Sequence, residues 1–542
     1  MESNGLSFRV KSIIFVLVLC VIPCLTFIWA DANQGEVNTE KTLLARVNAE
    51  IKKVLFFDMA FGSIEIDNVD RDGSLVYDEL GKPTKRDIDI PFLVMLLILG
   101  GIFFTFWYRW ITIRGFKHSI DVIRGKYDRP EDTGEISHFR ALTSALSATV
   151  GLGNIAGVAV AIQLGGPGAV FWMIIAAVFG MGEKFCTCVL SQLYRKVNSD
   201  GSISGGAMYY VDLGLKQMGG SWVPIGKILG VMYAVMIMGG AIGGGNMFQV
   251  NQTAEAFRGT FHIPESYNWL IGAIMAIVVG VVVIGGIKRI GAATARVVPT
   301  MCGIYVTASL FIILTNITRV PETIGLIFTM AFSQNAFYGG LFGVLVMGIR
   351  RAAFSNEAGL GSAAIAHAAA KTDEPVREGI VGMIGPFIDT VIVCTMTAIV
   401  VIITGAWNDP SVPAEAGVLL TTKAFGSVIG WFPIILTISI ALFAFSTMLS
   451  WCYYGERGWV YLLDHFNGVG LKTVIVFRIV FVGFIIFGAI NKLEDVIDFS
   501  DMLILSMAFP NIVGSIILAP RVLEKVRDYW GRYTSGEMKP IR

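Results

Sequence analysis

The chain has 542 residues, of which 54% are apolar and only 15% are charged, and its formal net charge is +1. A soluble protein of this size cannot cover its surface with so few charged residues, so most of the chain must lie in lipid. No basic surplus is present to attract nucleic acid, because Lys and Arg collect in short segments between apolar runs. Composition therefore excludes a soluble protein and predicts an all-α polytopic membrane protein without a nucleic-acid partner.

The N-terminus carries an apolar run with a basic start. Arg9 and Lys11 precede apolar residues 12–29, and Ala30-Asp31-Ala32 follows as a small-x-small site. This pattern predicts a signal peptide over residues 1–32, with an uncleaved anchor as the alternative. The polar segment 33–89 would then lie on the non-cytoplasmic side. Its residues 68–79 are similar to a calcium-binding EF-hand loop, but we interpret them as a β-hairpin in which residues 64–66 precede the turn and residues 75–77 follow it.

Eleven apolar segments long enough to span a bilayer follow. The first, at residues 90–110, is an extra span, and a basic stretch from Arg109 to Arg129 comes after it. Because such residues stay preferentially in the cytoplasm, this stretch sets the direction of all later spans and places the tail, residues 521–542, inside. We predict a multi-pass protein of a bacterial inner (plasma) membrane. The further spans are expected at residues 139–163, 169–192, 224–252, 267–286, 297–315, 337–369, 380–404, 427–455, 472–490 and 496–518.

Two of these spans are interrupted by glycine. Gly151-Leu152-Gly153-Asn154 breaks one, and residues 354–362, which also contain a Gly-Leu-Gly run, break the other. By the predicted topology the two breaks enter the membrane from opposite sides. Corresponding broken helices in two halves of a transporter indicate an inverted repeat with its binding site near the midplane. The two five-helix repeats would cover residues 139–315 and 337–520.

A broken helix offers N–H groups at one half-helix and C=O groups at the other, so it can bind a carboxylate and a sodium ion side by side. The Leu152 and Gly153 amides suit the carboxylate, and the Asn154 oxygen suits sodium or an ammonium group; an interhelical hydrogen bond is the ordinary alternative for Asn154. Glu357 is the one acid in its apolar neighbourhood and would meet the amine, the cation or a proton. A structural salt bridge from Glu357 to Arg350 or Arg351 is the alternative.

Other polar and aromatic residues in the spans are less specific. Gln249 is expected on a helix face that lines the cavity. Ser446 and Thr447 suit a cation, although back-bonding to the preceding turn is their ordinary role. Phe354 and Trp451 either cap a small side chain or merely pack. Adjacent Glu183 and Lys184 point about 100° apart, so they are expected to pair with other helices or to anchor near an interface.

Several motifs, in order along the chain, resemble the alanine or glycine:cation symporter family. They are residues 134–159, 165–169, 354–362, Phe387-Ile388-Asp389-Thr390 and 443–457, and the resemblance covers about residues 127–522. It implies a LeuT-like fold of two inverted five-helix repeats after one extra N-terminal transmembrane helix. It also implies transport of alanine, glycine or a close relative with sodium, and in some members with protons.

The first break is similar to that of LeuT, and this similarity implies roles for single residues. The Leu152 and Gly153 amides would bind the substrate carboxylate. In the family pattern Glu183 and Thr187 stand in the reverse order, which puts any charge pairing in that span in doubt. The substrate site is predicted to contain Leu152, Gly153, Asn154, Gln249, Phe354, Asn356, Glu357, Thr447 and Trp451. The sodium sites are predicted to contain Ser147, Thr149, Val150, Asn154, Ser355, Ser446 and Thr447.

The sequence thus predicts a secondary active symporter that imports alanine or glycine with sodium by alternating access, without a cofactor. No phosphate-binding loop is present in the sequence, so an ion gradient would supply the energy. A membrane-embedded enzyme is disfavoured because the five histidines are scattered. A channel or sensor on a transporter scaffold stays open, as do sodium against proton and alanine against glycine.

Overall fold

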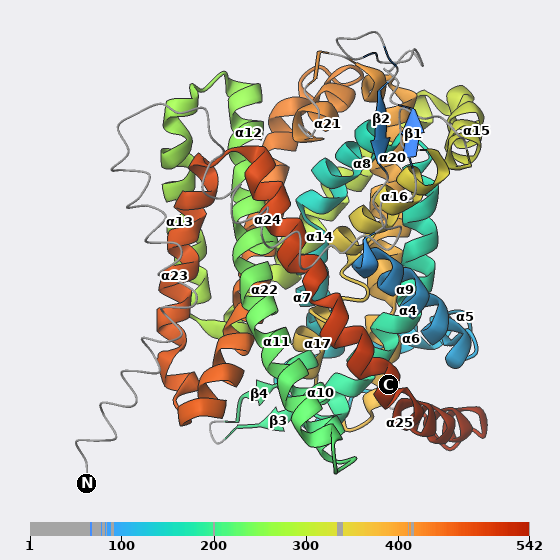
Figure 1. Ribbon diagram of the computed structural model, residues 1–542, viewed down its shortest axis with the longest axis vertical. Helices are drawn as coiled ribbons and strands as arrows, with labels where there is room; N and C mark the ends of the chain where they lie inside the picture. Colours follow the sequence, from blue (N-terminus) through green and yellow to red (C-terminus); the bar gives the residue numbers. More distant parts are fainter. Residues whose placement is uncertain are drawn as a thin grey trace.

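The computed structural model describes residues 65–67, 77, 82, 84–87, 91–198, 201–332, 340–409, 411–412 and 417–540. The predicted signal peptide, residues 1–32, and most of the polar segment 33–89 lie outside these residues, as does nearly all of the EF-hand-like stretch. Helices dominate the described chain and form a single bundle (Figure 1).

A short two-stranded sheet lies in the polar segment. Strand β1, Glu65–Asp67, pairs antiparallel with β2, Lys85–Asp87, so that Ile66 lies opposite Arg86. The predicted partner, residues 75–77, lies outside the described residues except for Tyr77, so that pairing stays a prediction.

The described residues contain eight helices that are long and apolar enough to cross a membrane. A ninth span is the bent pair α7, His138–Thr149, with η1 and α8, Gly153–Gly165, whose two parts meet at 52°. The apolar helix α4, Phe92–Trp107, is the predicted extra helix. The second broken span consists of α16, Gly340–Asn356, and α17, Ala363–Ala368. Together these elements account for the eleven predicted spans.

The unbroken spans lie close to their predicted positions, and their ends differ. Helix α14, Gly286–Thr315, begins eleven residues before the predicted start, because a helix satisfies its own backbone groups and continues from lipid into water. The other spans comprise α9, Ala169–Leu193; α11, Trp222–Ile242, with η2, Gly243–Met247, and α12, Phe248–Phe261; α13, Asn268–Val283; α18, Pro375–Gly382, with α19, Ile384–Pro386, η6, Phe387–Cys394, and α20, Thr395–Ile403; α22, Phe432–Asn467; α23, Gly470–Ile490; α24, Leu493–Ser506; and α25, Ala508–Thr534.

The two halves of the bundle repeat the same element order in opposite directions. Each half starts with a broken helix, and α7 leads upward to α8 in Figure 1 whereas α16 leads downward to α17. Each half also has a short helix between its second and third spans. This is α10, Ala207–Lys216, at the lower end of the bundle and α21, Gly417–Gly426, at the upper end. The predicted inverted repeat after one extra helix is confirmed.

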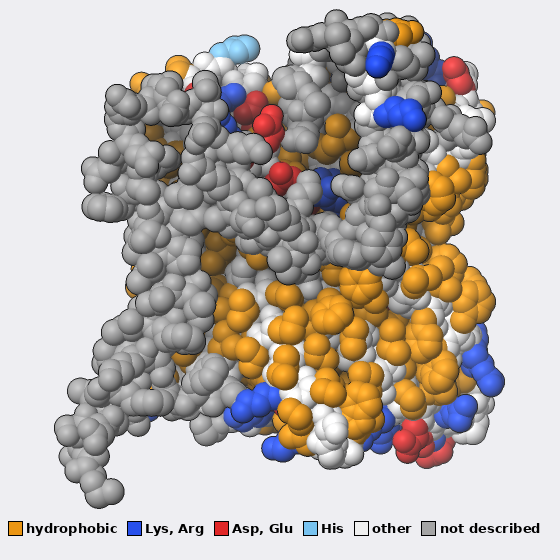
Figure 2. All heavy atoms as spheres, in the orientation of Figure 1, with side chains coloured by type: hydrophobic (Ala, Val, Ile, Leu, Met, Phe, Trp, Pro, Cys, Tyr) orange, Lys and Arg blue, Asp and Glu red, His pale blue; other side chains and the backbone are white. Residues whose placement is uncertain are grey.

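The outer surface of the bundle suits lipid. Only 28% of the apolar window of α13 and 33% of that of α23 is buried against protein, so most of both helices faces outward. Figure 2 shows hydrophobic side chains over a broad area of the visible face, with Lys and Arg along its lower rim. A wide apolar surface that ends at a charged rim is typical of a membrane-embedded protein.

The C-terminal end of α25 docks on α6, Phe116–Ile123, outside the membrane spans. The imidazole Nε2 of His118 lies 2.7 Å from the Tyr529 hydroxyl, and its ring stacks on Tyr533 at 4.0 Å between centroids. Burial and, to a smaller extent, the charge of Arg377 lower the pKa of His118 to about 4, while Asp121 opposes this shift. The docked contact therefore requires a neutral imidazole.

Lowering the pH from 7.5 to 5 is expected to loosen this contact. Undocked His118 binds a proton near pH 6.5 and docked His118 near pH 4, so the docking free energy is complete above pH 6.5 and falls as the pH drops toward 4. The expected loss at pH 5 is about 2 kcal/mol. Hydrogen exchange of the α25 amides measures it, and His118→Phe should remove the pH dependence. Equal protection at both pH values in the unmodified protein would contradict the expectation.

Candidate substrate and sodium site

The first break separates α7 from η1 at residues 150–152. The Gly151 N–H donates to Asn154 Oδ1 at 2.9 Å, and the Leu152 N–H donates to Gln249 Oε1 at 3.4 Å. A Cβ on Gly151 would lie 2.5 Å from Thr447 Oγ1, so glycine is required for this close approach. The Gly151 amide is thus bonded within the broken helix itself, whereas the Leu152 amide points at a side chain of α12. The long contact of Leu152 is one that a carboxylate can replace.

The second break turns the chain through left-handed residues. Glu357 has a φ of +55°, and Gly359 and Gly361 follow at +87° and +74°. Neighbouring helices satisfy the freed carbonyls: Lys184 Nζ donates to the Asn356 carbonyl at 2.8 Å, and the Tyr233 hydroxyl donates to the Leu360 carbonyl at 2.9 Å. The break is therefore held by side chains of α9 and α11, as irregular backbone inside a membrane protein requires.

Asp389 of η6 connects the two breaks and is fully buried. Its Oδ1 accepts from Asn154 Nδ2 at 2.6 Å, and its Oδ2 accepts from the hydroxyls of Ser355 and Thr390 at 2.8 Å each. The prediction from sequence quoted Asp389 only as part of a motif and gave it no role. The signal that could have found it is a lone carboxylate in an otherwise apolar span.

Several residues predicted for the sodium sites lie together where α22 meets α7. Thr447 Oγ1 donates to the Ser147 carbonyl at 3.0 Å, and Ser147 Oγ donates to the Ser446 carbonyl at 2.6 Å. These contacts hold α22 directly against the end of α7, where Val150 follows. Ser446 Oγ instead donates to the Phe443 carbonyl at 3.0 Å, which is the back-bonding role that the sequence left open.

The predicted substrate residues on other helices gather around the first break. Trp451 Nε1 donates to the Ala148 carbonyl at 3.3 Å, and Gln249 Nε2 donates to the Gly244 carbonyl at 2.9 Å. Phe354 packs edge-on against Phe248, with ring centroids 5.1 Å apart. All of these side chains are buried, so the predicted substrate residues pack together away from solvent.

Three predicted site residues have other partners. Glu357 accepts from the Ser362 hydroxyl and not from the arginines; Arg350 and Arg351 bind Asp501 of α24 instead, with Nη2 to Oδ2 distances of 2.8 Å. The alternative salt bridge was wrong, because α16 ends at Asn356 and the left-handed Glu357 turns away from its face.

The other two, Asn356 and Thr149, bond to protein groups outside the first break. Asn356 Nδ2 donates to Thr390 Oγ1 at 3.0 Å, which again links α16 to η6. Thr149 Oγ1 donates back to the Ala145 and Leu146 carbonyls at 3.3 Å each. The side chain of Thr149 is therefore used within α7, and only its carbonyl is left for the predicted sodium role.

The site is covered from both ends of the bundle. At the upper end in Figure 1, Thr421 of α21 donates to the Ile155 carbonyl of η1 at 3.2 Å. At the lower end, the segment before α7 joins the segment after α17: the Glu135 N–H donates to the Ala369 carbonyl at 2.8 Å, and the Lys371 N–H donates to the Ile136 carbonyl at 2.8 Å. The described conformation is closed at both breaks.

Comparison with known proteins identifies relatives over most of the chain. The family model described as "Sodium:alanine symporter family" matches residues 79–541. The Sodium/alanine symporter AgcS of Methanococcus maripaludis is 40% identical over 440 residues, which cover 81% of this chain and 94% of that protein. The Probable sodium/glutamine symporter GlnT of Bacillus subtilis is 34% identical over 451 residues, which cover 82% and 89%.

A solved structure, that of MhsT in complex with L-phenylalanine, is similar over 71% of this chain and 98% of its own, with 14% identity and a TM-score of 0.47. The family model describes cation-coupled transporters, so the alternative of a membrane-embedded enzyme is excluded. Because that model matches well over half of the residues, the chain belongs to the sodium:alanine symporter family.

Proposed function

We propose that this protein imports a small neutral amino acid, alanine or glycine, together with sodium, by alternating access. The observation that carries the proposal is the carboxylate of Asp389, buried between the two broken helices and bonded to Asn154 and Ser355. The hydrogen-bond donors to Asp389 are all neutral, and Lys184, although within electrostatic range, bonds to the Asn356 carbonyl, so this buried carboxylate suits a further cation. The weakly bonded Leu152 amide, which suits an anion, lies one residue beyond Gly151, so both charges of a zwitterion have complements nearby.

The substrate carboxylate would lie at the first break. The Leu152 N–H has only the 3.4 Å contact with Gln249, and an ionised acceptor there forms a stronger, charge-assisted bond. Gly153 faces the second break, since a Cβ at this position would lie 3.3 Å from Ser355 Cα. The amine would then point toward Asp389 or Glu357, across the gap between the broken helices.

Two sodium positions are proposed beside the substrate. In one, Asn154 Oδ1, the Thr149 carbonyl and Asp389 supply neutral and charged oxygens, with Ser355 adjoining. In the other, the carbonyls of Ser147 and Val150 join the hydroxyls of Ser446 and Thr447. Oxygen donors of this kind suit a hard cation, and the half-helix ends add the negative end of a helix dipole.

The walls favour a small side chain. A Cβ on Gly245 would lie 2.3 Å from Trp451 Cβ, and one on Gly244 would lie 2.0 Å from Ile504 Cδ1. Bulky residues therefore already fill the space beside these glycines, and a large substrate side chain would clash. Alanine or glycine fits such a site better than glutamine, which the name of one relative indicates.

We further propose an orientation for the transport cycle. The basic residues that follow α4 place the lower end of Figure 1 in the cytoplasm of a bacterial cell and α21 on the outer side. Outward opening would then lift α21 from η1, and inward opening would separate α7 from α17 and α18. Residues 33–89 would lie on the outer side of the membrane after the signal peptide, residues 1–32, is removed.

The inner closure contains a buried carboxylate between two histidines. The imidazole Nδ1 atoms of His138 and His367 each contact one oxygen of Glu378, and all three side chains are at most 1% exposed. His138 starts α7, whereas His367 and Glu378 lie on α17 and α18. Inward opening must break the His138 contact.

His138→Ala is therefore expected to favour the inward-open conformation. Loss of one hydrogen bond to a charged group is worth about 1.5–3 kcal/mol, or roughly a tenfold to hundredfold shift in the opening equilibrium. Maleimide labelling of a cysteine at Ser144, applied from the cytoplasmic side, should accelerate accordingly. His262→Ala, at an exposed loop histidine, is the matched control. Unchanged labelling in His138→Ala would show that this contact does not hold the inner closure.

Uptake of labelled alanine by purified protein in liposomes tests the proposal, with and without an inward sodium gradient. Accumulation should require sodium and should be lost in Asn154→Ala, because Asn154 joins Gly151 to Asp389. Asn408→Ala, at an exposed residue of η7, Ala406–Asn408, controls for the substitution itself. If folded protein accumulates no neutral amino acid under a sodium or a proton gradient, the symporter proposal is wrong and a sensor or channel takes its place.

A further inference from the structure

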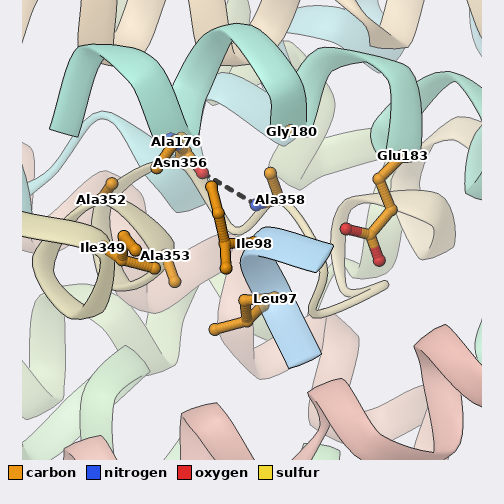
Figure 3. A pocket seen from close by; sticks show the side chains of 10 residues that line it. All are labelled: Leu97, Ile98, Ala176, Gly180, Glu183, Ile349, Ala352, Ala353, Asn356 and Ala358. Carbon is orange, nitrogen blue, oxygen red and sulfur yellow. Dashed lines mark hydrogen bonds between the residues drawn. The ribbon is translucent and has the colours of Figure 1, made fainter. Parts of the chain in front are cut away.

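A small cavity lies behind the second break, where the extra helix α4 packs on α9 and α16 (Figure 3). Its volume of about 20 Å³ is enough for one water molecule. Most of its lining is apolar, and the acidic member is Glu183. The residues that line it are Leu97, Ile98, Ala176, Gly180, Glu183, Ile349, Ala352, Ala353, Asn356 and Ala358.

The carboxyl group of Glu183 has no cationic partner in the described part of the chain. Glu183 is 1% exposed, and no Lys, Arg or His nitrogen of those residues lies within 4.0 Å of its oxygens. Its hydrogen bond is a long one, 3.4 Å from Asn511 Nδ2 to Oε1. A single weak bond from a neutral amide does not compensate a buried charge.

The adjacent cation, Lys184, interacts with the second break and not with Glu183. Its Nζ donates to the Asn356 carbonyl and lies within electrostatic range of Glu357 and Asp389. Successive residues of a helix point about 100° apart, so Lys184 cannot turn toward Glu183 without leaving the break. The positive charge of Lys184 thus lies on the side of the break that faces Asp389, and not on the side of the cavity that contains Glu183.

We propose that Glu183 is a proton-binding site, distinct from the proposed sodium and substrate positions and going beyond them in function. In the closed conformation the carboxyl group holds a proton, which removes its charge, and the water-sized cavity hydrates it. Ionisable residues inside membrane proteins commonly mark such proton sites. The extra helix α4 closes the cavity on one side through Leu97 and Ile98, so movement of α4 or α16 would expose the site to water.

The protonation state of Glu183 is linked to the second break through Gly359. A Cβ on Gly359 would lie 3.1 Å from Glu183 Oε2, and Asn511 Nδ2 also donates to the Gly359 carbonyl at 2.8 Å. Ionised Glu183 would place a negative charge against this left-handed linker and its carbonyl. The other titratable groups that face Glu183 or the linker are Lys184 and Cys186 on α9, Tyr108 after α4, Tyr210 on α10, Tyr233 on α11 and Glu357 in the break.

Infrared spectroscopy of the purified full chain tests the proton directly. The difference spectrum between the unmodified protein and Glu183→Gln at neutral pH should contain the C=O band of a protonated carboxylic acid. Glu524→Gln, at an exposed residue of α25, should show carboxylate bands instead. Carboxylate bands from Glu183 at neutral pH would overturn the proposal. This readout does not depend on transport, so it decides the point even if the proposed function fails.

Sodium-driven alanine uptake at increasing pH provides the second measurement. Once the pH is high enough to remove the proton, uptake by the unmodified protein should fall about tenfold per pH unit. Uptake by Glu183→Gln, which is permanently neutral, should not show that fall, whereas Glu524→Gln should retain it. An identical alkaline fall in Glu183→Gln would overturn the proposal. So would loss of uptake at every pH in folded Glu183→Gln, because the carboxylate charge would then be required.

Discussion

Asp389→Asn is expected to abolish sodium-dependent uptake at ordinary sodium concentrations. The substitution keeps the shape of the side chain and removes the charge that both broken helices surround. An asparagine also brings an NH2 group against Asn154 Nδ2 or against the Ser355 and Thr390 hydroxyls, which now donate to the carboxylate. A loss of about 3 kcal/mol in sodium binding corresponds to roughly a hundredfold higher sodium concentration for half-maximal uptake.

Sodium titration of alanine uptake in liposomes measures this effect, and thermal unfolding provides a second readout. Sodium chloride should raise the unfolding temperature of the unmodified protein relative to choline chloride, because a ligand that binds only the folded state stabilises it. Asp389→Asn should lose that rise. Asp528→Asn, at an exposed residue of α25, should keep both responses. An Asp389→Asn protein with unchanged sodium dependence would remove Asp389 from the sodium site.

Features of the site with a local signal could be predicted from the sequence. Gly151 and the Gly-Leu-Gly run after Glu357 mark backbone that leaves helical geometry within an apolar span. The structure breaks both helices there. The nearness of Ser147 and Thr447 was implied by the family resemblance, and the structure joins them by a hydrogen bond of 3.0 Å.

Partners that lie far apart in the chain carry no such signal. Asp389 bonds to Asn154 across 235 positions, and Arg351 bonds to Asp501 across 150. Periodicity shows which residues are in the membrane, but it does not show which helix packs against which. For this reason a salt bridge from Glu357 to the arginines nearest in sequence was left open as the alternative. In the structure α16 packs on α24, and those arginines bind Asp501 instead.

The same limit applies to helix ends and strand pairs. Hydropathy marks where lipid ends, so it placed the start of α14 at residue 297, although the helix continues back to Gly286. An alternating pattern marked residues 64–66 as a strand, but the identity of its partner depends on where the chain returns. Elements were thus predicted better than their contacts, because contacts depend on tertiary packing.

Gly244→Ala is expected to disrupt the closed site, and Ile504→Val is expected to restore it. A methyl group on Gly244 would lie 2.0 Å from Ile504 Cδ1 and 3.4 Å from Phe354 Cε2. Overpacking of this kind costs about 1–3 kcal/mol, and here it would push Ile504 or Phe354 from its place beside the break. Valine at position 504 lacks the Cδ1 atom, so the double variant regains the space that the alanine occupies.

Initial rates of alanine uptake and unfolding temperatures of the four proteins form a double-mutant cycle. The two substitutions should couple by about 1–2 kcal/mol, because each removes the clash or the cavity that the other creates. Gly483→Ala on α23 has open space around the added methyl group and should behave as the unmodified protein. Additive effects would show that Ile504 does not pack on Gly244 in the transporting conformation. Coupling in uptake, together with stronger exclusion of larger amino acids by Gly244→Ala, would place α24 in the wall that limits substrate size.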